Sequence, residues 1–182
     1  MERRPLGELE VSRIALGCGN FGGIGSAPEL FGQGESREEA FALMDAASAA
    51  GVTVFDTAAS YGGGRSERWV GEWRSERGAP VTLSTKVFWS VTGDPSDRGL
   101  SRDRILRELD GSLDRLQAEG VDMYLTHEPD EETPIAETLG ALDEVVRAGK
   151  AGAIGASNLD GAGLEQALDA AARVRRGMGA KA

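Results

Sequence analysis

Apolar residues follow two alternating patterns along the chain, and these predict a regular succession of strands and helices. Short runs that are apolar throughout predict buried strands, whereas apolar residues spaced three or four apart predict amphipathic helices. The strands are expected at residues 14–16, 52–56, 81–86, 121–126 and 153–156. The helices are expected at residues 36–51, 66–78, 101–119, 133–149, and from before Leu164 to about Arg175. Each unit then spans roughly 30–40 residues, the length of a βα repeat.

Capping residues support several of these helix boundaries. Ser36 with Glu39 three residues on predicts a capping box, and Thr133-Pro134 predicts an N-cap followed by the first helical residue. Ser101 is expected to cap the third helix. The helix faces expected to be buried carry Phe41, Met44 and Ala47; Leu106, Leu109, Leu113 and Leu116; Ile135, Leu139, Leu142 and Val146; and Leu164, Ala167, Leu168 and Ala171.

Strands that are apolar throughout predict an α/β fold whose parallel sheet is shielded on both faces. Two architectures fit this succession: an open doubly wound sheet, and part of a (β/α)8 barrel of the TIM type. A short hairpin that turns at Gly7-Glu8 is expected within residues 1–13. No linker or change of composition divides the chain, so residues 1–182 are expected to form one domain with a tail at 173–182.

Composition and charge exclude several classes of function. The chain has 182 residues, of which 26 are glycine, and its net charge is −10. This acidic balance argues against a nucleic-acid or membrane partner, because both kinds of binding need basic patches. No run of about 18 apolar residues is present, and the lone Cys18 permits neither an internal disulfide nor a cysteine-based zinc site. We therefore expect a cytoplasmic protein without a bound metal.

Polar residues stand where the expected strands end. Asp56 ends the second strand, Tyr61 follows it by five residues, Lys86 ends the third, and His127, the only histidine, follows the fourth. Because the carboxyl ends of parallel strands share one edge of the sheet, these four side chains are expected to converge.

This set of residues predicts a proton-transfer site. A free tyrosine titrates near pH ~10, too high for efficient proton transfer at neutral pH, but a nearby ammonium favours the phenolate. Lys86, oriented by Asp56, would supply that charge to Tyr61. His127 would hold a carbonyl oxygen while the tyrosine protonates it. Because no side chain supplies hydride, this reaction requires a nicotinamide cofactor.

Each of these residues also has a structural interpretation. The aspartate can cap a loop, the tyrosine can pack as a half-buried ring, the lysine can be a solvated strand end, and the histidine can belong to a turn. Their shared edge favours the catalytic interpretation. The segment GCGNFG at residues 17–22 matches the fingerprint GxGxxG, but no helix follows it directly. The fingerprint also expects an acidic residue at the end of the second strand about 20 residues on, and Asp56 lies much further along the chain. We therefore reject a Rossmann site.

Four segments of the chain together resemble the aldo-keto reductase superfamily. They are DTAASYGGGRSERWVG (56–71), TK (85–86), YLTHEPD (124–130) and GASN (155–158), in the family's order. The resemblance covers residues 5–172 and implies a (β/α)8 barrel that reduces aldehydes and ketones to alcohols with NADPH. It implies that Tyr61 is the proton donor and that Asp56 and Lys86 are the pair that tunes it. It implies that His127 orients the substrate.

The resemblance also implies where cofactor and substrate bind. The cofactor contacts expected on this basis are Gly17, Asn20, Asp56, Ser157 and Asn158, of which Ser157 and Asn158 match the residues that hold the nicotinamide carboxamide. The hairpin is similar to the plug at the bottom of the family barrel. Phe21, Trp89 and the loop at residues 88–99 are candidate walls of the substrate pocket, although aromatic packing explains them equally well.

The family barrel has eight strands and typically about 250 residues, whereas five βα units are predicted here. We therefore expect a barrel truncated after its fifth βα unit, without the segments that hold the adenosine phosphates. Open strand edges favour aggregation, so we expect poor solubility, or assembly as a homo-oligomer or with a completing chain. Three functions stay open: an NADPH-dependent carbonyl reductase, a truncated non-catalytic fragment, and a nucleotide-sensing regulatory subunit of the same fold.

Overall fold

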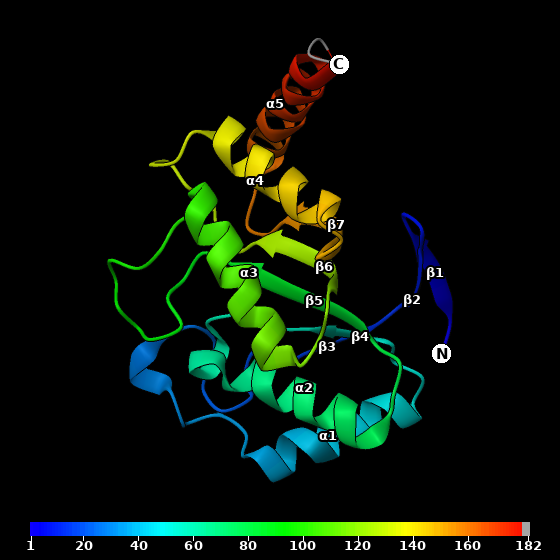
Figure 1. The fold of residues 1–182 in the computed structure, drawn as a ribbon. Coiled ribbons are helices and arrows are strands. Elements are labelled where there is room, and N and C mark those ends of the chain that lie inside the picture. The colour runs from blue at the N-terminus through cyan, green and yellow to red at the C-terminus, as the bar shows by residue number, and fades with distance from the viewer. Residues whose placement is uncertain (180–182) are drawn as a thin grey trace.

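The computed structural model describes residues 1–179, which form an antiparallel hairpin followed by a parallel sheet (Figure 1). The hairpin pairs β1 (Arg3–Leu6) with β2 (Leu9–Ser12). The parallel strands are β3 (Ala15–Gly17), β4 (Val54–Asp56), β5 (Thr82–Val87), β6 (Val121–Thr126) and β7 (Ala151–Ala156). Every predicted strand is present, with ends displaced by no more than two residues.

The strands lie in the sheet in the order of the sequence, β3-β4-β5-β6-β7, and every neighbouring pair is parallel. Right-handed crossovers place all helices on one face of such a sheet unless the strand order reverses. No reversal occurs among the described strands, so the doubly wound alternative is excluded. The predicted α/β fold of the barrel type is confirmed, with five βα units in the described part of the chain.

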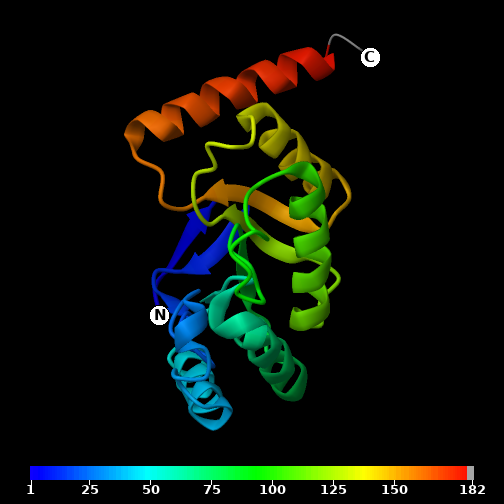
Figure 2. The same cartoon turned by 90° about the vertical axis from the view of Figure 1, so that its left-hand side faces the viewer.

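A helix follows each parallel strand. The helices are α1 (Arg37–Ala49), α2 (Arg65–Arg77), α3 (Arg102–Leu116), α4 (Ile135–Arg147) and α5 (Gly161–Gly179). Two short 3-10 helices, η1 (Pro28–Leu30) and η2 (Tyr61–Gly64), lie in the loops after β3 and β4. Figure 2 shows α5 crossing one end of the molecule beside α4.

The predicted capping box begins α1. The backbone N–H of Glu39 donates to Ser36 Oγ at 3.3 Å, and the N–H of Ser36 donates to Glu39 Oε2 at 2.9 Å. The predicted start of α4 is one residue too early, because its N-cap is Pro134, whose carbonyl accepts the first helical hydrogen bonds. Ser101 is the N-cap of α3, but its side chain makes no capping hydrogen bond.

The prediction that the last helix ends near Arg175 is wrong, because α5 continues to Gly179. Helical hydrogen bonds are local, so a helix can continue past the end of its periodic apolar pattern. The remainder of the predicted tail, residues 180–182, lies outside the described residues.

The core lies between the sheet and α1 to α4. Its largest fully buried side chains include Trp73, Tyr124, Phe21, Phe55, Met44, Leu83, Ile105, Leu109 and Leu116. The rings of Phe55 and Trp73 lie 5.1 Å apart between centroids, and Tyr124 Oη donates to the carbonyl oxygen of Ile105. This contact satisfies the one polar atom of an otherwise apolar ring in the core.

The face of α5 that the sequence predicts to be buried is exposed instead. Leu164 is 51% exposed and Leu168 is 62% exposed, while Ile154 on β7 is 41% exposed. These side chains line a groove of about 880 Å³ between α4, β7 and α5. The prediction is wrong because β7 is the last strand of the described sheet, and no described element covers its outer edge.

Candidate active site

Asp56 and Lys86 form an ion pair at the carboxyl ends of β4 and β5. Lys86 Nζ lies 2.7 Å from Asp56 Oδ2 and also donates to the carbonyl oxygen of Thr57 at 2.8 Å. The lysine side chain is 7% exposed and the aspartate side chain is 34% exposed. A buried ammonium is costly unless it is paired and hydrogen-bonded, and these contacts meet both conditions.

Tyr61 is brought to this pair by an unusual turn. Gly62, Gly63 and Gly64 all have positive φ, a conformation that favours glycine, and a Cβ on Gly62 would lie 2.5 Å from the carbonyl oxygen of Phe21. The turn places Tyr61 Oη 3.4 Å from Lys86 Nζ. The same nitrogen lies 4.9 Å from the centroid of the tyrosine ring.

His127 completes the group from the end of β6. Its Nε2 lies 3.3 Å from Tyr61 Oη, and the two rings meet edge to face with centroids 5.3 Å apart. Burial, together with the positive charge of Lys86, lowers the pKa of His127 to about 4, against a weaker opposing effect of Asp56. The imidazole is therefore neutral at pH 7. Its Nδ1 is buried without a hydrogen-bond partner among residues 1–179.

The structure thus brings together all four residues that the sequence predicts to converge. The hydroxyl of Tyr61 lies between an ammonium and a neutral imidazole. A carbonyl oxygen that reached this site could accept hydrogen bonds from the Tyr61 hydroxyl and from the imidazole of His127. The arrangement is suited to delivering a proton to that oxygen.

The residues expected to contact the cofactor surround this group unevenly. Gly17 pairs with Asp56 in the sheet, and a Cβ on Gly17 would meet no atom within 4 Å, so the space beside it is open. The carbonyl oxygen of Asn20 accepts from the N–H of Glu35, which holds the loop after β3 together. Two residues after the end of β3, Gly19 lies against the Tyr61 ring.

Ser157 and Asn158 follow β7. The N–H of Ser157 donates to the carbonyl oxygen of Thr126. Asn158 has a φ of +56°, which is rare for a residue other than glycine, and its Nδ2 donates to the carbonyl oxygen of His127 at 2.8 Å and to Glu128 Oε1 at 3.0 Å. Asn158 therefore joins the end of β7 to the end of β6 beside the histidine.

Of the candidate pocket walls, Trp89 lines a cavity and Phe21 does not. Phe21 is 2% exposed and belongs to the core, so it is not a wall of an open pocket. Trp89 and Phe88 line a cavity of about 600 Å³ together with residues of the loop after β6. Phe88 and Glu128, which both line it, directly follow Val87 and His127.

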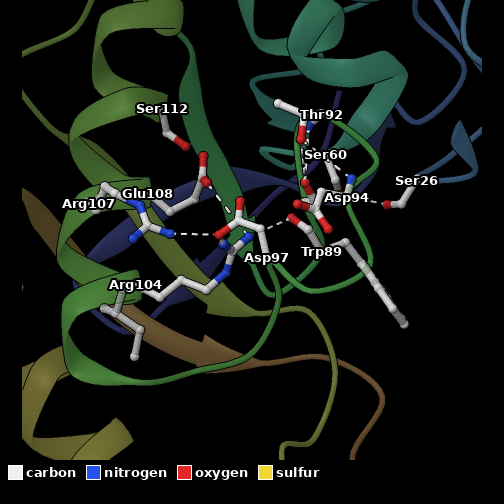
Figure 3. Close-up of polar contacts among 12 residues, drawn as sticks. Ser26, Ser60, Trp89, Thr92, Asp94, Asp97, Arg104, Arg107, Glu108 and Ser112 are labelled. Atoms are coloured by element: carbon white, nitrogen blue, oxygen red, sulfur yellow. Dashed lines mark hydrogen bonds and ion pairs between the residues drawn. The ribbon is translucent and has the colours of Figure 1, made fainter.

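Two arginines of α3, Arg104 and Arg107, hold the loop that carries Trp89. Figure 3 shows Asp97 of this loop between Arg104 and Arg107. Arg107 Nη2 donates to Asp97 Oδ1 at 2.7 Å, and Arg104 Nη2 donates to the carbonyl oxygen of Trp89 at 3.1 Å. Arg104 is buried although its partner Asp97 is not, so the arginine holds the loop from the side that faces the protein interior.

Sequence reasoning missed Ser84, which donates to Asp56 Oδ1 at 2.9 Å. Its signal was its place two residues before Lys86, because alternate residues of a strand face the same side. It also missed Glu67, a fully buried carboxylate that accepts from Thr85 Oγ1 at 2.5 Å and pairs with Arg115 at 2.6 Å. An acidic residue near the start of a helix carries no signal of burial.

Two negative findings apply to the described residues. Within residues 1–179 there is no group of three or more histidine, cysteine, aspartate or glutamate residues arranged to hold a metal ion. In the same part of the chain, no helix combines the length and the apolar character needed to cross a membrane.

Comparison with known proteins gives consistent relatives. The model of the aldo/keto reductase family matches residues 13–175. The chain is 39% identical over 193 residues to the uncharacterized oxidoreductase YrpG of Bacillus subtilis (strain 168), covering 98% of this chain and 56% of that protein. It is also 39% identical over 179 residues to a probable voltage-gated potassium channel subunit beta of Oryza sativa subsp. japonica, covering 96% of this chain and 52% of that protein.

A solved structure shows the same relation. The crystal structure of a thermostable aldo-keto reductase, Tm1743, matches with a TM-score of 0.76 at 34% sequence identity, covering 93% of this chain and 58% of that chain. The chain thus spans about half the length of the relatives that it matches.

Proposed function

The chain belongs to the aldo/keto reductase family, and on this premise we propose that it reduces aldehydes or ketones to alcohols with NADPH, with Tyr61 as the proton donor. The observation that carries the proposal is the position of the Tyr61 hydroxyl, 3.4 Å from Lys86 Nζ and 3.3 Å from His127 Nε2. The oxidoreductase and aldo-keto reductase relatives support the same class of reaction.

In the proposed reaction the residues of this chain handle the proton. The neutral imidazole of His127 hydrogen-bonds the carbonyl oxygen, and Tyr61 donates its proton to that oxygen. The ammonium of Lys86 stabilises the phenolate that remains, and Asp56 balances the charge of the lysine. Bound NADPH would supply the hydride to the carbonyl carbon, which completes the alcohol.

The residues present fit the nicotinamide end of this cofactor. Gly17 leaves the space at its Cβ position open beside Asp56, and the Asn158 amide uses only its Nδ2 group for hydrogen bonds among the described residues. Its amide oxygen is thus an acceptor for a carboxamide, and Ser157 offers a hydroxyl beside it. The loop after β7, residues 157–160, contains no lysine or arginine to hold phosphates. We propose that residues outside this loop hold the phosphates.

A titration with NADPH, in which the quenching of tryptophan fluorescence reports binding, tests the proposal. Saturable binding that is weakened in Asn158→Ala, together with aldehyde-dependent oxidation of NADPH, is the expected result. Tyr61→Phe should then lower the rate by about 10²- to 10⁴-fold while leaving binding intact, because only the proton donor is lost. A folded chain that binds no NADPH at millimolar concentration would contradict the proposal that this chain is itself an enzyme.

A second candidate is a nucleotide-sensing regulatory subunit of the same fold. The 39% identity to a probable voltage-gated potassium channel subunit beta favours it. The same titration separates the two, since a sensor would bind NADPH tightly and show no turnover that depends on Tyr61. A chain that neither binds NADPH nor oxidises it would favour the third hypothesis, a non-catalytic fragment.

We further propose that residues 1–182 act as one domain whose open edge is covered in the cell. The exposed apolar side chains of β7 and α5 support this, because contiguous apolar surface of this kind is typical of interaction sites. A second copy or a completing segment would pair with β7. The acidic charge and the NADPH chemistry fit a cytoplasmic location without nucleic-acid or membrane partners.

A further inference from the structure

We propose that Ser84 is a positioning residue for the proton donor, which it serves by fixing the carboxylate of Asp56. The inference rests on the proposed function of Asp56, Lys86 and Tyr61. Ser84 makes no contact with the tyrosine and would act only through the aspartate.

The carboxylate of Asp56 is held at both oxygens by one strand. Asp56 and Ser84 lie directly opposite each other in the register of β4 and β5. Ser84 Oγ donates to Oδ1 at 2.9 Å, and Lys86 Nζ donates to Oδ2 at 2.7 Å. Because Ser84 and Lys86 are two residues apart on β5, their side chains emerge on the same face of the sheet.

The aspartate needs this second contact because it is more exposed than the serine and the lysine that hold it. Its side chain is 34% exposed, whereas the side chain of Lys86 is 7% exposed and Ser84 as a whole residue is 1% exposed. The terminal torsion of an aspartate is broad, so a carboxylate held at one oxygen turns and exchanges that contact for water. The rigid, dry hydroxyl of Ser84 removes this freedom.

The orientation of the aspartate determines what the lysine does. A lysine ammonium has three N–H donors and accepts nothing. In the structure two of them are used by Asp56 Oδ2 and the carbonyl oxygen of Thr57, which leaves the third for Tyr61 Oη at 3.4 Å. If Asp56 turned, the ammonium would follow it and the contact with the tyrosine would weaken.

The neighbouring Thr85 offers a matched control. It lies between Ser84 and Lys86, is equally buried, and its hydroxyl also donates to a carboxylate, but that carboxylate is Glu67 on the helix side of the sheet. Thr85→Val therefore removes a buried hydroxyl one residue from Lys86 without touching Asp56. A merely structural role of Ser84 would make the two substitutions behave alike.

The first test measures how fast the ammonium protons of Lys86 exchange with water, and it needs no catalytic activity. The chain has three lysines, Lys86, Lys150 and Lys181, and a proton–nitrogen spectrum of lysine ammonium groups detects those that are hydrogen-bonded and protected. Lys86→Gln assigns the Lys86 signal. We expect the protons of this ammonium to exchange with water at least about tenfold faster in Ser84→Ala, to stay protected in Ser84→Thr, and to stay protected in Thr85→Val.

The second test uses carbonyl reduction in the same variants. Ser84→Ala should lower kcat by about tenfold with little change in KM, because substrate contacts remain while the proton donor loses its support. Ser84→Thr should restore most of kcat. Thr85→Val should lower the stability of the fold and leave kcat within about twofold, because the lysine keeps its partners.

The outcomes separate this inference from the proposed function. If the wild type reduces no carbonyl but the Lys86 signal responds as expected, the proposed function fails and the positioning by Ser84 stands. A Lys86 signal equally protected in Ser84→Ala overturns the inference, whatever the activity. So does a wild-type spectrum without a protected Lys86 signal, because the ammonium would then not be held.

Discussion

Two regions of the sheet, its middle at β4 and β5 and its edge at β7, are built from the same kind of βα unit and differ sharply in how they are covered. Around β4 and β5, α2 and α3 bury even charged groups: Glu67 is fully buried, and its partner Arg115 exposes 15% of its side chain. At β7, the apolar residues Leu164 and Leu168 of α5 are more than half exposed.

This difference shows that burial depends on neighbours rather than on the amphipathic pattern of a helix. α3 is packed between α2 and α4, whereas among the described helices α5 packs mainly against α4. The proposed proton-transfer residues Asp56, Tyr61 and Lys86 all come from the well-covered side. The proposed cofactor residues Ser157 and Asn158 come from the end of β7, at the open side.

The largest expected effect compares one leucine from each side. Leu109→Ala, at a fully buried position of α3, should lower the free energy of unfolding by about 2–5 kcal/mol, because it leaves a cavity. In the monomer, Leu168→Ala, at a position 62% exposed, should change it by less than about 0.5 kcal/mol. Urea unfolding measures both.

The mass of the protein in solution shows how the stability losses of the two leucine variants are to be explained. An equal loss in Leu168→Ala and Leu109→Ala would mean that the face of α5 is buried in solution. Light scattering after size exclusion should then show an assembly that Leu168→Ala weakens. A monodisperse, folded monomer would contradict the proposal that a second copy covers this face.

A slightly smaller effect is expected from charged pairs. Glu67→Gln should lower the free energy of unfolding by about 3 kcal/mol, because Arg115 loses a buried carboxylate and keeps Glu108 as its charged partner. Arg147→Ala breaks an exposed pair with Asp143 on α4 and should cost less than about 1 kcal/mol. Equal losses in thermal or urea unfolding would contradict the difference in burial between the two sides.

The smallest expected effect, in mild acid, is a pH dependence that comes from His127. Its pKa is lowered from 6.5 to about 4 by burial and by Lys86, so between these values the unfolded chain binds a proton that the folded chain does not. Folding stability should therefore fall as the pH drops from about 6.5 toward 4, by about 1 kcal/mol at pH 5.5, and this contribution should be level above pH 7.

Unfolding at several pH values, in the wild type and in His127→Gln, isolates this contribution from that of the carboxylates. Since His127 is the only histidine, its imidazole signals in an NMR titration are unambiguous and should move near pH 4. A midpoint near 6.5 would mean that the ring is solvated and separated from Lys86, which would contradict its placement beside Tyr61.

Much of the fold and part of the candidate site could be predicted because the signals are local. The strand at residues 121–126 has the predicted limits, and Ser36 and Glu39 form the predicted capping box. The convergence of Asp56, Tyr61, Lys86 and His127 followed from their place at strand ends, since parallel strands bring their carboxyl ends to one edge.

Other features depended on contacts between distant segments. The serine at position 84 resembles any small residue in a buried strand until the register of β4 and β5 places it opposite Asp56. The leucines of α5 have the same spacing as those of α3, and only the absence of a covering neighbour in the described structure distinguishes them.

The sequence by itself therefore determined the order and type of the elements and the identity of the reactive groups, because helix periodicity, capping and strand ends are properties of neighbouring residues. The tertiary structure decided which carboxylate Ser84 holds, which charge shifts the pKa of His127, and which apolar face is left open. These depend on residues that are dozens of positions apart, and their proximity exists only once the strands are paired and the helices packed.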